Sequence, residues 1–176
     1  MVEQIEWLKR TFPENLPSGV FPTIVERFRG TPARIEDLIR SFPSNKMTER
    51  VNGKWSIQEH IGHLCDLEEL NENRLREYLS KAEYLSPADL SNRKTEEANH
   101  NAGSLKKILS DFRRVRMDFV AKLERLTEDE VTRKAIHPRL KKPMQLVDWV
   151  YFMAEHDDHH IAMMTHGAKL LSSKIA

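Results

Sequence analysis

Residues 56–67, SIQEHIGHLCDL, carry the pattern that decides the fold. Ser56 and Glu59 form a capping box, in which the serine side chain caps the first helical turn and the glutamate side chain reaches back to the serine N–H. Apolar residues then recur at helical spacing to about residue 81; they are Ile57, Ile61, Leu64, Leu67, Leu70, Leu75 and Leu79. The stretch therefore predicts a long amphipathic helix.

Three other segments show the same helical period. They span residues 22–42, about 103–123 and about 144–171. Thr31-Pro32 lies inside the first of them, so either a new helix begins at Thr31 or the helix kinks there. Four long helices with connections of modest length predict an all-α fold, an antiparallel four-helix bundle in one domain of residues 1–176.

The regions between and before these helices are less regular. Residues 1–21 are interpreted as an N-terminal extension, with a short helix followed by a proline-rich loop. Its apolar stripe would consist of Ile5, Trp7, Leu8 and Phe12. Residues 127–130, TEDE, form a second capping box that opens a short helical turn, and the residues around His137-Pro138 are predicted to be a linker.

Composition limits the classes of partner. Of 176 residues, 39% are hydrophobic and 31% charged, which is enough apolar material for one core. The 28 basic and 27 acidic side chains give a formal net charge of +1, so no field of one sign attracts nucleic acid or an anionic membrane. The densest basic runs, residues 113–116 and 139–142, are interpreted as a solvated helix face and a loop.

Cysteine content and hydropathy predict the compartment. Cys65 is the only cysteine, which excludes an internal disulfide and suits a reducing environment. The sequence shows neither an apolar signal core near its start nor an apolar run of about 18 residues. We therefore expect a cytoplasmic protein.

The histidines form two groups on two predicted helices. His156 and His160 are four residues apart, so their side chains lie one above the other on one helix face, where two imidazoles can share an ion. Such a pair also occurs in helices that bind no metal. A third histidine from another helix would leave one coordination position open, which is typical of catalytic rather than structural sites.

The third ligand is expected from the helix that begins at Ile57. His63 lies closer to the average direction of its apolar face than His60, although both border that face and are only about 60° apart on the helical wheel. His159 is rotated by about 100° from His160 and is expected at a helix boundary or in solvent. His63, His156 and His160 are therefore the predicted metal ligands.

Two motifs strengthen this prediction by resemblance. Residues 55–66, WSIQEHIGHLCD, resemble the first signature of the DinB/YfiT-like family, in which Trp-Ser or Trp-Thr opens the second helix and a later histidine is a ligand. Residues 156–160, HDDHH, resemble its second signature, H-x-x-x-H. The positions that match the family's ligands are His63, His156 and His160. The resemblance covers the chain after about residue 22.

The resemblance implies an up-down-down-up four-helix bundle, often dimeric, that holds one divalent ion, zinc or nickel. It also implies a metal-dependent hydrolase, or a transferase or isomerase that uses a low-molecular-weight thiol and acts on an unidentified small molecule. The alternative is a non-catalytic helical bundle, a stress-related or interaction module in which metal binding is incidental. Fold and metal alone do not decide between these functions.

Several neighbours of the ligands have expected roles. Asp66 can accept the free N–H of a ligating histidine, and His60 and His159 can support the ligands in the same way. An ordinary surface position is an equally good interpretation of Asp66. Cys65 is interpreted as a small packed residue, and Trp55 as a structural plug at the start of its helix.

Two other metal proteins fit less well. His156, His160 and His166 have the 1, 5, 11 spacing of a metzincin protease, but Asp157 and Met163 replace its glutamate and glycine. A di-iron bundle needs paired Glu-x-x-His motifs on facing helices, and residues 97–100 supply only one, in a predicted loop.

Overall fold

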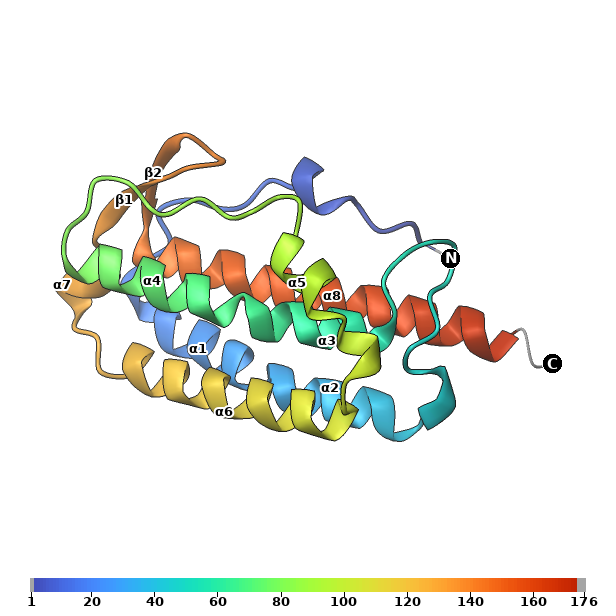
Figure 1. Ribbon diagram of the computed structural model, residues 1–176. Helices are drawn as coiled ribbons and strands as arrows, with labels where there is room; N and C mark the ends of the chain where they lie inside the picture. Colours follow the sequence, from blue (N-terminus) through green and yellow to red (C-terminus); the bar gives the residue numbers. More distant parts are fainter. Residues whose placement is uncertain (1, 174–176) are drawn as a thin grey trace.

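The computed structural model describes residues 2–173 and consists mainly of helices (Figure 1). Four rods, two of them made of two consecutive helices, form the bundle. Their bounds are α1 (Phe21–Arg29) with α2 (Thr31–Arg40), α3 (Ile57–Asp66) with α4 (Glu68–Leu79), α6 (Leu105–Leu123), and α8 (Leu146–Ser173).

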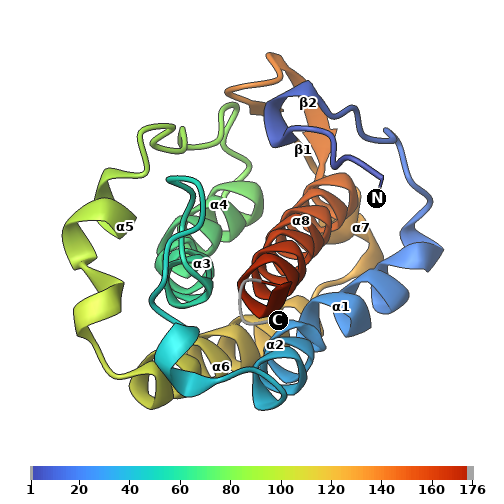
Figure 2. The same ribbon diagram turned by 90° about the vertical axis from the view of Figure 1, so that its right-hand side faces the viewer.

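The rods run up, down, down and up along the chain, as Figure 1 shows. The second and third rods are therefore parallel, and residues 80–104 return along the bundle between them. Seen from the end of the bundle, α8 lies between α1 and α3, and α6 closes the other side (Figure 2). This arrangement confirms the predicted four-helix fold and places α3 directly beside α8.

Local sequence accounts for the helix boundaries. The predicted capping boxes are both formed, at Ser56 with Glu59 before α3 and at Thr127 with Glu130 before α7 (Glu128–Val131). α2 begins at Thr31, with Pro32 in its first turn, where the missing proline N–H has no helical acceptor to lose. Leu67 separates α3 from α4 but keeps helical angles, so the two continue as one rod.

Short elements connect the rods. They are the 3-10 turns Trp7–Lys9, Ser18–Val20, Ser44–Lys46 and His100–Ala102, the helix α5 (Arg93–Ala98), and the antiparallel strands β1 (Lys134–His137) and β2 (Lys142–Gln145). The prediction of a linker around His137-Pro138 is therefore wrong in detail, because these residues lie in the hairpin that β1 and β2 form. Ala135 and Met144, which pair across the hairpin, are both buried, and this gives the strands an inner face.

The N-terminal extension also differs from the prediction. Between residues 2 and 20 it forms no α-helix, only the 3-10 turns Trp7–Lys9 and Ser18–Val20, and its first part runs extended along α8. Ile5 and Leu8 are each 64% exposed, so they do not share one buried stripe with Trp7 and Phe12. The rings of Trp7 and Phe12 instead pack against Phe152 of α8, with centroids 5.0 and 4.9 Å away.

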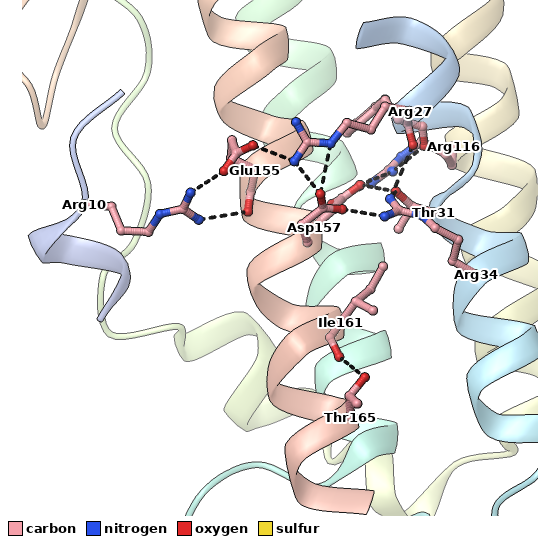
Figure 3. A network of polar contacts seen from close by, with 11 residues as sticks. Arg10, Arg27, Thr31, Arg34, Arg116, Glu155, Asp157, Ile161 and Thr165 are labelled. Carbon is pink, nitrogen blue, oxygen red and sulfur yellow. Dashed lines mark hydrogen bonds and ion pairs between the residues drawn. The ribbon is translucent and has the colours of Figure 1, made fainter. Parts of the chain in front are cut away.

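A buried polar network joins all four rods of the bundle, and Figure 3 shows part of it. Arg116 of α6 is 1% exposed and donates to Glu68 at 2.7 Å and to Asp157 of α8 at 2.5 Å. Thr31 of α2 donates to the same Asp157 at 2.6 Å. The interpretation of residues 113–116 as a solvated face is thus wrong for Arg116, whose charge is neutralised inside the bundle by two carboxylates.

None of the described helices combines the length and the apolar character that a membrane span requires.

Candidate metal centre

Three histidines from two neighbouring helices converge in the bundle. His63 of α3 and His156 and His160 of α8 each offer a ring nitrogen, and these three atoms lie within 4.8 Å of one another. The Nε2 atoms of His156 and His160 are 3.2 Å apart. Two nitrogens on one tetrahedral zinc, each at about 2.1 Å, lie roughly 3.4 Å apart, so this pair is already spaced for a shared ion.

Neighbouring side chains orient two of these rings. The Nδ1 atom of His63 lies 3.1 Å from the hydroxyl of Thr95, and that hydroxyl donates to Asp66 at 3.0 Å. The Nδ1 atom of His160 lies 2.8 Å from Nδ1 of His60. Because their Nδ1 atoms are engaged in this way, His63 and His160 keep Nε2 for an ion. Asp66 thus acts on His63 through Thr95 rather than directly.

Burial keeps these imidazoles neutral. It is the main cause that lowers the pKa of His63 to about 4 and the pKa values of His156 and His160 well below the ordinary range. Repulsion between the clustered histidines adds to the shift for His156 and His160. Only the neutral ring can bind a metal ion, so the chemistry of this donor set fits a divalent cation.

Aromatic side chains cover the three histidines. The ring of Trp55 lies 4.8 Å from that of His63 and stacks over His160 at 6.2 Å, while its Nε1 donates to Glu96 at 2.6 Å. Trp55 is therefore more than a plug at the start of α3, because it forms a wall of the site. On the other side, the ring of Trp7 lies 4.8 Å from that of His156.

Residues 2–16, which we call the N-terminal strap, lie across α8 at this point. Gln4 donates to the backbone carbonyl of His159 and lies 2.9 Å from its Nδ1. His159 is only 9% exposed for this reason, and its predicted place at a helix boundary or in solvent is wrong. Farther along the strap, Arg10 pairs with Glu155 (Figure 3), and the backbone N–H of Leu16 donates to Asp148 at 2.9 Å.

A cavity of about 470 Å³ opens beside the three histidines. The strap, the loop after α4 and the β1–β2 hairpin surround it, and apolar side chains that include Leu67, Leu70, Phe152 and Met153 supply much of its wall. A cavity of this size holds a small organic molecule. The three histidines therefore lie where a bound molecule can reach them.

The remaining candidates lie elsewhere. His166 is exposed and does not belong to the cluster, so the geometry of a metzincin protease is absent from the described residues. His100 contacts Asp66 at 2.8 Å, with its ring against Gly62, where no larger residue would leave it room. Cys65 is half-buried, and burial raises the pKa of its thiol to about 11, which agrees with a packed residue rather than a reactive thiolate.

Thr95 and Trp7 were not identified as site residues from the sequence. Thr95 lies in α5, within a segment that was expected to be a loop, and Trp7 lies in the extension. Neither carries a local motif, because each reaches the histidines only through the tertiary fold.

Comparison with known proteins places the chain in a family. The family model of the DinB superfamily matches residues 27–164. A comparison with curated protein sequences gives no significant match.

Two solved structures share the fold. YfiT from Bacillus subtilis, described as a probable metal-dependent hydrolase with an unusual four-helix bundle topology, is 17% identical, with a TM-score of 0.80 over 93% of this chain and 94% of its own. A mycothiol-dependent maleylpyruvate isomerase is 12% identical, with a TM-score of 0.63 over 81% of this chain and 59% of its own. With more than half of its length matched by the family model, the chain belongs to the DinB superfamily.

Proposed function

We propose that this chain binds one divalent metal ion, zinc or nickel, through His63, His156 and His160 and uses it for catalysis on a small molecule. The observation that carries the proposal is the convergence of three neutral imidazoles, two of them buried and that of His156 half-buried, at the edge of a cavity. The description of YfiT as metal-dependent supports it. When bound, the ion would supply Lewis acidity, which lowers the pKa of a water or a thiol and yields a nucleophile near neutral pH.

The chain's own residues would prepare this site. Thr95 and His60 hold the rings of His63 and His160, so the ligand nitrogens need little rearrangement to bind. Trp55 and Trp7 exclude water from two sides, which strengthens electrostatic interactions within the site. We propose hydrolysis, or transfer to a low-molecular-weight thiol, as the reaction class.

Metal content and turnover test the proposal together. Protein purified without an affinity tag is expected to contain about one zinc or nickel ion per chain by elemental analysis. The loaded protein is then assayed against panels of esters, amides and thiol adducts, with chelator-treated protein as the control. Stoichiometric metal without turnover on any panel would favour the non-catalytic bundle, and the absence of metal would refute the site.

The Thr95 hydroxyl is expected to matter for metal affinity. Thr95→Val keeps the shape of the side chain but breaks the link from His63 to Asp66. We expect zinc affinity to fall by roughly 10- to 100-fold, the usual cost of losing a partner that orients a ligand. Competition with a chromophoric chelator measures this, with Thr132→Val, at an exposed position after α7, as the matched control. Equal affinities of the two variants would contradict the role of Thr95.

The pH dependence of zinc affinity is expected to reflect burial. An ordinary imidazole predicts a loss of affinity below about pH 6. Burial lowers the pKa of His63 to about 4, so this ligand stays neutral to lower pH. We therefore expect affinity to hold from about pH 7 to about pH 5 and to fall steeply as the pH approaches 4.

Competition titrations, with circular dichroism to verify folding at each pH, measure this profile. A pH-independent affinity would contradict histidine ligation. A fall centred near the ordinary imidazole pKa of about 6.5 would instead contradict the effect of burial. A homodimer, the other expectation from the resemblance, is tested by light scattering of the same preparation.

A further inference from the structure

Two arginines at the cavity lack an acidic partner. Arg139, in the turn of the β1–β2 hairpin, forms no hydrogen bond or ion pair with any residue between 2 and 173. Its guanidinium group lies instead 5.7 Å from the ring centroid of Trp7 and 5.3 Å from that of Phe152. The strap and α8 thus hold Arg139 in place while leaving its N–H groups without acceptors.

Arg74 of α4 is the second of these arginines. It is 5% exposed, and its Nε and Nη2 donate to the backbone carbonyl of Ser86 at 2.9 and 2.8 Å. No carboxylate of the described chain forms an ion pair with it. Burial, and to a smaller extent the charge of Arg139, lower its pKa to about 10, while Tyr78 and Glu77 act in the opposite direction. The Glu77 oxygens themselves accept hydrogen bonds from Asn73 and Ser86. Burying a guanidinium group without a counterion is costly, and a bound anion would offset that cost.

His137 adds an unpaired donor to the same wall. It is 2% exposed, and its Nδ1 accepts a hydrogen bond from the N–H of Leu140 at 3.3 Å. The hydrogen of the neutral ring therefore lies on Nε2, for which the described residues provide no partner. Burial, followed by the charges of Arg74 and Arg139, lowers the pKa of His137 to about 3, so the ring stays neutral and keeps this donor.

Acidic residues at the cavity do not balance these charges. Asp157 already accepts hydrogen bonds from Arg116 and Thr31. Asp89 is exposed and caps its own loop through the N–H groups of Ser91 and Arg93. The cavity therefore combines apolar side chains, three neutral histidines that can hold an ion, and two guanidinium groups that lack acidic partners.

We propose that Arg74, Arg139 and His137 bind the carboxylate of a small organic acid, whose other end lies at His63, His156 and His160. Guanidinium groups match the planar geometry of a carboxylate and can bind both of its oxygens. Apolar side chains such as Phe152 and Met153 would contact the hydrocarbon part between the two ends. Only the placement of the acid's other end at the three histidines rests on the proposed metal function. The carboxylate site is tested in protein without metal.

The test compares acids with neutral molecules of the same shape. Benzoate, 3-phenylpropionate and 4-phenylbutyrate, with their amides, are titrated by calorimetry into zinc-loaded and chelator-treated protein. We expect at least one acid to bind both forms of the protein about 10-fold or more tightly than its amide, since hydrogen bonds to charged groups contribute strongly. Its binding should weaken by about 10-fold in Arg139→Gln and stay unchanged in Arg114→Gln, at an exposed position of α6.

Arg74 needs an additional control because it is buried. Arg74→Gln is compared with Arg74→Lys, which keeps the charge, and both are first shown to unfold near the wild-type temperature. Weaker acid binding in Arg74→Gln than in Arg74→Lys supports the proposal. If Arg74→Gln does not fold, Arg139→Gln alone decides.

Several results would overturn the proposal. The first is that the acids bind no better than their amides, and the second is that wild type and Arg139→Gln bind the acids equally well. The third is that a phosphonate of the same shape binds more tightly than the acid, which would identify a phosphate group rather than a carboxylate as the ligand. A wild-type protein that prefers acids but cannot be loaded with zinc would refute the metal function alone. Zinc binding with no preference for acids would refute the carboxylate site alone.

Discussion

Alanine substitution of His63, His156 or His160 is expected to abolish stoichiometric zinc binding. The three ring nitrogens lie within 4.8 Å of one another, so each variant leaves only two ligands. Zinc sites with four protein ligands have apparent binding free energies of about 10–16 kcal/mol, or about 3 kcal/mol per ligand. Loss of one ligand therefore corresponds to a loss of at least about 100-fold in affinity. Elemental analysis and chelator competition of untagged protein measure the effect.

Two other histidines provide controls for these variants. His166→Ala alters an exposed residue on the same helix as two of the ligands and is expected to keep full occupancy. His159→Ala is expected to keep the ion as well, because His159 lies outside the cluster. Full occupancy in His63→Ala would instead assign the third ligand to His60, whose Nδ1 lies 2.8 Å from that of His160.

Removal of the Arg116 side chain is expected to give the largest loss of stability. In Arg116→Ala, the carboxylates of Glu68 and Asp157 would stay buried without their cation, which typically costs about 3–5 kcal/mol of unfolding free energy. One oxygen of Glu68 has no partner among the described residues even with Arg116 present, so little else can compensate. Urea unfolding of chelator-treated protein measures the loss without a contribution from metal.

Arg113→Ala is the matched control from the same basic run. Arg113 pairs with Glu36 at the surface, and exposed pairs contribute at most about 1 kcal/mol. Adding Glu68→Gln and Asp157→Asn to Arg116→Met should recover part of the lost stability, since the stranded charges are then removed. Similar unfolding midpoints for Arg116→Ala and Arg113→Ala would show that the network contributes little.

The helices and the histidine pair could be predicted because their signals are local. Capping boxes at Ser56 and Thr127 and the apolar period depend on residues within a few positions of one another. The spacing of His156 and His160 fixes their shared face in the same way. The choice of His63 depended on the direction of a helix face and on the family motif. The structure brings His63 next to His156 and His160, and metal ligation by the three stays a prediction.

The ion network was missed although the sequence contains a signal for it. Arg116 lies four residues after Phe112 and three before Phe119, within the apolar stripe of its helix. Asp157 likewise lies four residues after Met153. Charges of opposite sign on the apolar stripes of two helices predict a buried pair, whereas the local run of arginines suggested a solvated face.

The strap and Thr95 could not have been predicted from local pattern. Gln4 and His159 are 155 positions apart, and Thr95 reaches His63 only because residues 80–104 fold back over α3. The hairpin at residues 134–145 was obscured by His137-Pro138, which is typical of a linker. Such contacts depend on the packed bundle, which no short stretch encodes.

The N-terminal strap also bears on how fast the site fills and empties. Trp7 lies against His156, and the pairing of Arg10 with Glu155 fastens the same segment to α8. The strap covers one side of the site, so how often it lifts, and not bond strength alone, would contribute to the residence time of an ion. Two variants with equal equilibrium affinity could therefore differ widely in how long a chelator needs to empty them.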